Sequence, residues 1–172
     1  MSILNEEIPL QQFNSDYTYK GNRLASFFRS GRAESRKLLP AGTPLWKCTS
    51  FGLLNPRGNI TEWWVDGNLL APARDACTRL HCTLQEFARA RYAVSYDWNS
   101  MDNLLEARLI QPVYAFIGET RGVSSHFERD KSGNVTTTPL DNVRLIGGNA
   151  QYCIPNLTTA HIVEISSRSA RA

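Results

Sequence analysis

Two short segments hold the residues best suited to chemistry. The first is Glu62-Trp63-Trp64, an acid followed by two tryptophans. Neighbouring side chains of a β-strand point to opposite faces, so one tryptophan can fill the core while the other lines a cleft. The second segment runs from Gly147 to Asn156, where a glycine pair permits a sharp turn into a strand led by Gln151. Each segment also has a purely structural interpretation, the tryptophans as core bulk and the glycine turn as the start of an edge strand.

Several common catalytic motifs are missing from the sequence. Gly147-Gly148 fits no phosphate-binding loop, and there is no nucleophile elbow of a serine hydrolase. Cys77, His81 and Cys82 lie close together, but no second Cys/His pair completes a zinc set, so we expect no metal site. Without a secretion signal we also expect no disulfide framework among the four cysteines.

Size and composition indicate a globular protein. The chain has 172 residues, 42% of them hydrophobic and 20% charged, which suits a single domain. No apolar run reaches the roughly 18 residues of a membrane span, and the first residues lack a signal-peptide pattern. We therefore expect a cytoplasmic location and no membrane partner. An alternative left open is delivery into a target cell by a route that does not need a signal peptide.

Basic residues gather between Lys20 and Lys37. Six of them stand there against one acid, Glu34. A solvated arm accounts for this pattern, and the alternative is a patch for an anionic partner such as a nucleic acid or an acidic protein.

The periodicity of the remaining chain predicts strands, then helices, then more strands. Thr83 and Glu86 have the spacing of a capping box that begins a helix, and Phe87, Ala90, Val94 and Trp98 follow as its core-facing stripe. Arg89 and Arg91 are expected in solvent. A first short helix opens near Pro72, residues 119–140 are predicted as a long loop, and the predicted strands are 43–50, 60–65, 104–110, 113–118, 142–146, 150–154 and 161–165.

This order of elements favours an α+β fold over a doubly wound parallel sheet. We expect residues 1–38 to form an irregular basic leader, residues 39–167 a single α+β domain, and residues 168–172 a flexible tail.

Taken in order, these segments resemble the ADP-ribosyltransferase family over about residues 40–166, with its twisted, largely antiparallel sheets flanked by a few helices. In that family an early strand carries an aromatic and then a basic residue that hold NAD, as Leu45-Trp46-Lys47 does. Late in the chain a loop leads into a strand that opens with the catalytic glutamate, and the segment from Gln151 to Pro155 is similar. His161 to Ile165 resembles the closing strand.

The resemblance implies a site for NAD as substrate. Lys47 would hold NAD, Trp63 or Trp64 would stack on nicotinamide, and Gln151 would contact the ribose. Tyr152 would be a further NAD-binding residue. The implied activity is NAD-dependent mono-ADP-ribosyl transfer or NAD hydrolysis, as in a bacterial toxin or effector, with an unidentified acceptor.

Two departures from the family pattern affect this site. Lys47 stands where many members have arginine, so a bidentate contact with the phosphate or ribose would be replaced by a single point charge. Gln151 stands where the glutamate belongs, and a glutamine neither carries charge nor accepts a proton from the attacking group. A different carboxylate would then act, with Glu62, Glu119 or Glu128 as candidates.

Two alternatives to catalysis are left open by the sequence. One is an inactive module that binds a nucleotide or an ADP-ribosylated partner. The other is an interaction protein that uses the basic segment 20–37.

Overall fold

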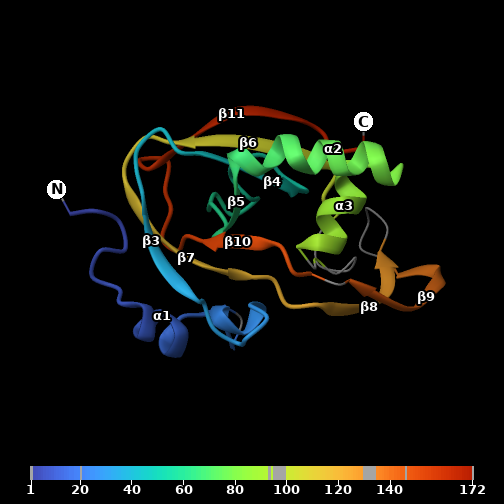
Figure 1. Ribbon diagram of the computed structural model, residues 1–172, viewed down its shortest axis with the longest axis horizontal. Coiled ribbons are helices and arrows are strands. Elements are labelled where there is room, and N and C mark those ends of the chain that lie inside the picture. The colour runs from blue at the N-terminus through green and yellow to red at the C-terminus, as the bar shows by residue number, and fades with distance from the viewer. Residues whose placement is uncertain are drawn as a thin grey trace.

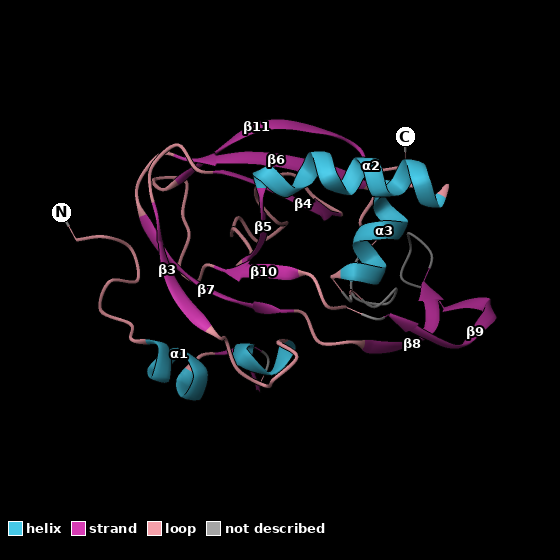
Figure 2. Ribbon diagram, in the orientation of Figure 1, coloured by secondary structure: helices cyan, strands magenta, loops and turns pink. Residues whose placement is uncertain are grey.

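The computed structural model describes residues 2–19, 21–92, 94, 100–129, 135–145 and 147–171. They form a mixed α+β structure, with one curled antiparallel sheet, a separate hairpin, and helices on the outside of the sheet (Figure 1 and Figure 2). The α+β class expected from the sequence is confirmed.

The main sheet has seven strands in the order β11-β6-β4-β5-β10-β7-β3, and every neighbouring pair is antiparallel. Six of these seven strands are found close to predicted positions, and β3 was not expected. The strands are β3 Ser35–Leu39, β4 Pro44–Thr49, β5 Trp63–Asp66, β6 Asn103–Leu109, β7 Val113–Glu119, β10 Ala150–Cys153 and β11 Ile162–Ser169.

The sheet curls around an apolar interior. Leu39 of β3 and Ile162 of β11 belong to the two edge strands, yet they share one buried cluster with Trp64 of the central strand β5. A flat sheet would hold its edges far apart, so this cluster requires curvature. Strand alternation sends every second side chain inward, and the other side chains of the central strands meet the helices outside.

Two helices cover one outer part of the sheet. They are α2 Leu70–Leu80 and α3 Leu84–Arg91, which lie beside β4 and β6 in Figure 1. The capping box of Thr83 and Glu86 is confirmed, with the Glu86 amide donating to Thr83 Oγ1 at 3.1 Å and the Thr83 amide donating to Glu86 Oε2 at 2.7 Å. Helix α2 begins two residues before Pro72, which lies in its first turn.

The buried stripe of α3 differs from the predicted one. Leu84 and Ala88 are buried, whereas Phe87 packs against the same cluster but is only partly buried. Arg89 is also buried, at 4% exposure, because its guanidinium donates to the carbonyls of Val94 and Ser100. The expectation of a solvated Arg89 is therefore wrong. Trp98 lies outside the described residues.

The predicted irregular leader is instead part of the fold. Helix α1 Leu10–Asp16, the short strands β1 Thr18–Tyr19 and β2 Asn22–Arg23, and the 3₁₀ helix η1 Leu24–Phe27 precede β3. Phe13 and Phe28 are both 0% exposed and form a third buried cluster with Phe116 of β7. The leader was misjudged because its apolar residues are interrupted by polar and charged ones.

The basic residues of the leader lie on this folded segment. Arg36 stacks on the Tyr114 ring at 3.5 Å and donates to the carbonyls of Asn5 and Glu6, so it has a structural role. Arg29, Arg32 and Lys37 are exposed, and Lys20 lies outside the described residues.

Two other expectations on chain segments are corrected. Part of the predicted loop 119–140 is a hairpin of β8 Val123–Arg129 and β9 Val135–Leu145, which projects from one end of the molecule (Figure 1). The predicted tail from residue 168 begins inside β11, and Ala170 is 1% exposed against the cluster under α2 and α3. Among the described residues, no helix has both the length and the apolar character that crossing a bilayer requires.

Candidate functional site

The strands that hold the predicted site residues are neighbours in the sheet. Lys47 lies on β4, Trp63 and Trp64 on β5, and Gln151 and Tyr152 on β10, and these strands follow one another in the order β4-β5-β10. Segments about a hundred positions apart in the sequence therefore meet in the middle of the fold.

Lys47 points to the inner side of the curled sheet. Its ammonium donates to Thr61 Oγ1 and, at 3.1 Å, to the Trp63 carbonyl, and it lies 4.3 Å from the centre of the Trp64 ring. Removal from water disfavours the charged form, so burial lowers the pKa of Lys47 to about 7. Lys47 therefore loses its proton more readily than an ordinary lysine.

Glu62 is the carboxylate beside this lysine. Its charge raises the pKa of Lys47, against the larger effect of burial. Glu62 precedes β5, and its carbonyl accepts from the Ile154 amide at 2.7 Å, which fixes the backbone at the start of the strand. One base and one acid thus meet where β5 begins.

Trp64 and Tyr152 are core residues. They pair across β5 and β10 and are 0% and 7% exposed within the inner cluster. The Trp64 indole donates to the Thr61 carbonyl at 2.9 Å, and the Tyr152 hydroxyl donates to Asp66 Oδ2 at 3.3 Å. Burial, followed by the charge of Asp66, raises the pKa of Tyr152 to about 12. Neither ring is open to a ligand in this arrangement, which does not fit the expected stacking of Trp64 on nicotinamide or the expected contact of Tyr152 with NAD.

Trp63 and Gln151 lie on the outer face of the sheet. The opposite orientation of the two tryptophans was predicted correctly, since Trp63 packs against Phe27 and Phe28 at ring distances of 5.9 and 5.3 Å. Gln151 pairs with Gly118 of β7, where an added Cβ would come within 2.6 Å of the Phe28 ring. Lys47 and Glu62 are therefore close enough for their charges to interact, whereas Gln151 lies on the opposite face of the sheet from Lys47.

The other candidate carboxylates are less suited to the site. Glu119 ends β7 and pairs with Arg29 at 3.5 Å, and the two side chains are 47% and 58% exposed, so this is a surface ion pair. The side chain of Glu128 lies outside the described residues.

A polar junction that the sequence did not reveal lies at the Gln151 end of β10. Thr120 is 3% exposed, and its hydroxyl donates to the Arg91 carbonyl at 2.8 Å, which ties β7 to the end of α3. The Gly147 amide donates to the Ala90 carbonyl at 2.9 Å, and a Cβ at Gly147 would lie 2.6 Å from the Thr120 carbonyl oxygen. The sequence predicted a tight turn at the glycine pair, but no feature of the sequence indicated that Thr120 would lie against it.

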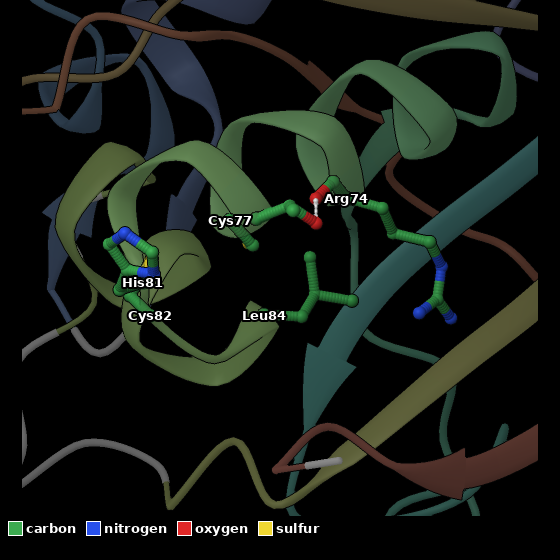
Figure 3. Close-up of a pocket in the computed structure, with 6 residues that line it drawn as sticks. Arg74, Cys77, His81, Cys82 and Leu84 are labelled. Carbon is green, nitrogen blue, oxygen red and sulfur yellow. Dashed lines mark hydrogen bonds between the residues drawn. The ribbon is translucent and has the colours of Figure 1, made fainter.

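A shallow cavity of about 400 Å³ lies apart from these residues, at the end of α2 (Figure 3). Its lining includes Cys77, His81 and Cys82, the group that the sequence placed close together. Within the part of the chain that the structure describes, no three His, Cys, Asp or Glu side chains are arranged to hold a metal ion.

Comparison with known proteins gives little further information. No protein family and no curated protein matches the chain. A chain of the solved structure "Rhs1-CT in complex with cognate immunity protein RhsI1" overlaps with it at a TM-score of 0.46 and 14% identity, over 80% of this chain and 82% of that one. A TM-score below 0.5 does not establish a shared fold.

Proposed function

We propose that this chain binds NAD and breaks its nicotinamide–ribose bond, as a mono-ADP-ribosyltransferase or an NAD glycohydrolase with an ADP-ribosyltransferase-like fold. The observation that carries the proposal is the Lys47 ammonium held by Thr61 and the Trp63 carbonyl at the start of β5, near enough to Glu62 for that charge to raise its pKa. A cation for the diphosphate and a carboxylate for the ribose are the two charges that this reaction requires.

Glu62 takes the part expected of Gln151 in this proposal. As the nicotinamide–ribose bond breaks, the bonding electron pair leaves with nicotinamide and positive charge develops on the ribose. A fixed carboxylate stabilises that charge, and it can accept the proton of the water or acceptor hydroxyl that adds to the sugar. Gln151 lies on the other face of the sheet and is left with a supporting role.

Lys47 suits a diphosphate because it is held in place and partly charged. Its two hydrogen bonds fix the ammonium, and a bound anion favours its protonated form. Since the pKa of free Lys47 is about 7, NAD is expected to bind more weakly as the pH rises from 6 to 8. Titration calorimetry at several pH values measures this trend.

The decisive experiment is nicotinamide release from NAD by the wild-type chain and two matched acid-to-amide variants. Glu62→Gln is expected to lower the rate by about 100-fold, the order found when one electrostatic contact to a transition state is removed. Glu119→Gln removes an exposed carboxylate of the Arg29 pair and is expected to leave the rate unchanged.

Three results would count against the proposal in different ways. Equal rates for Glu62→Gln and wild type would reject Glu62 as the carboxylate. NAD binding without nicotinamide release would favour the inactive binding module. Neither binding nor release would reject NAD as the ligand.

A further inference from the structure

The end of α2 brings two cysteines together through its backbone. The Cys82 amide donates to the Cys77 carbonyl at 3.1 Å, and the His81 amide donates to the Thr78 carbonyl at 3.4 Å. His81 between them is left-handed, with φ 53° and ψ 43°. This is the Schellman arrangement, which folds the residue after the helix back over its last turn and places the two side chains in contact.

The two thiols are in contact and differ in access. Both line the shallow cavity in Figure 3, and the Cys77 thiol donates to the carbonyl of Thr83, the residue next to Cys82, at 3.7 Å. Cys77 is 8% exposed, whereas Cys82 is only partly buried. Burial, followed by the neighbouring Cys82, raises the pKa of Cys77 to about 11. Cys82 is therefore the thiol that an external reagent meets first.

The rest of the cavity lining suits a small anionic disulfide. Arg74 and His81 flank the cysteines, and Thr78 adds a hydroxyl. The Arg74 side chain extends away from the two cysteines in Figure 3, so its guanidinium can meet a carboxylate of a peptide such as glutathione at some distance from the thiols. The cavity is open enough for a reagent to reach Cys82 and for the first product to leave.

We propose that Cys77 and Cys82 form a reversible disulfide by exchange with a low-molecular-weight disulfide such as glutathione disulfide. The Cys82 thiolate attacks one sulfur of glutathione disulfide, a mixed disulfide forms on Cys82, and one glutathione thiolate leaves. Cys77 then gives up its proton, attacks the Cys82 sulfur and releases the second glutathione. The two cysteines lose two electrons and two protons, and glutathione disulfide becomes two glutathione thiols.

Trypsin provides a direct test, because Arg79 lies between the two cysteines. The folded chain is incubated with excess glutathione disulfide, its remaining thiols are alkylated, and it is digested without reduction. A Cys77–Cys82 disulfide keeps the peptides 75–79 and 80–89 linked in the digest. Before alkylation, the oxidised chain weighs two hydrogen atoms less than the reduced chain. The number of free thiols falls from four to two. Reduction with dithiothreitol should separate the peptides again.

Two cysteine variants identify the order of the steps. Cys77→Ser is expected to stop at the mixed disulfide on Cys82, which adds the mass of one glutathione. Cys153→Ser removes a 0% exposed thiol of the separate cluster under the N-terminal segment and should leave the linked peptides unchanged.

The outcomes that overturn the proposal are visible in the wild-type digest alone. A stable mixed disulfide on Cys82 without linkage to Cys77 would contradict it. Linkage of Cys77 to Cys48, its buried neighbour under α2, would also contradict it, and peptide 48–57 would reveal that product.

Discussion

The position of Lys47 on strand β4 determines the environment of its side chain. On β4 the neighbours Trp46 and Cys48 face the helices, while Lys47 shares the inner face with Leu45. The half-buried ammonium is therefore partly removed from water, and Thr61, the Trp63 carbonyl and Glu62 compensate only part of that desolvation. This is the environment expected of a ligand-binding or catalytic lysine.

The lowered pKa of Lys47 predicts a specific pH dependence of stability. In the unfolded chain its pKa is 10.5, and in the folded chain it is about 7, so between these values the unfolded chain binds more protons. The free energy of unfolding should therefore rise with pH in this range, by at most about 1.4 kcal/mol per pH unit.

Urea unfolding of the wild type and Lys47→Met between about pH 7 and pH 9 measures this effect. The variant should be the more stable at pH 7, and the difference should shrink as the pH rises. Lys37→Met, which removes an exposed lysine, should show a constant difference. A constant difference for Lys47→Met as well would contradict the pKa assignment.

At the scale of elements, the corner between α2 and α3 is fixed by local bonds. Its first half is the Schellman end of α2 and its second half is the capping box of α3, joined through Cys82 and Thr83. The far end of α3 then accepts hydrogen bonds from Gly147 and Thr120 through its last carbonyls. The start of β10, with Gln151, is thus positioned by the helix pair.

Loss of the capping box should weaken this corner. Thr83→Ala removes the acceptor of the Glu86 amide and is expected to lower the free energy of unfolding by about 1 kcal/mol, measured by urea titration. Thr78→Ala is the control, because its hydroxyl only donates to the Arg74 carbonyl within α2. Equal effects of the two substitutions would mean that the cap does not contribute.

At the scale of the whole molecule, three buried clusters share one sheet. The inner cluster is enclosed by the curl, the second lies under α2 and α3, and the third lies under the N-terminal segment. Phe13 stacks on Phe116 with ring centres 4.0 Å apart, so the N-terminal segment closes the outer face of β7 and β10. This segment belongs to the domain that it was expected to precede.

Phe13→Ala tests that role. Because Phe13 is 0% exposed, its loss should lower the free energy of unfolding by about 3–5 kcal/mol. Leu38→Ala on the edge strand β3, where the side chain is 42% exposed, should cost far less. A small effect of Phe13→Ala, by the same urea titration, would restore the view of a peripheral leader.

The sequence by itself determined features that depend on neighbouring residues. The capping box at Thr83 and Glu86 needs only a spacing of three residues, and β4, β6 and β7 follow from apolar runs or from alternating side chains. The opposite faces of Trp63 and Trp64 follow from strand geometry alone.

Only the tertiary structure decided which faces meet. β3 was missed because an edge strand tolerates charged residues such as Arg36 and Lys37, which in the sequence resemble a solvated arm. Alternation predicts that two strand faces differ but does not say which of them turns inward, so Lys47 and Gln151 could be expected on one face and lie on two. That choice depends on the curl of the sheet and on contacts between residues far apart in the chain, which no local pattern contains.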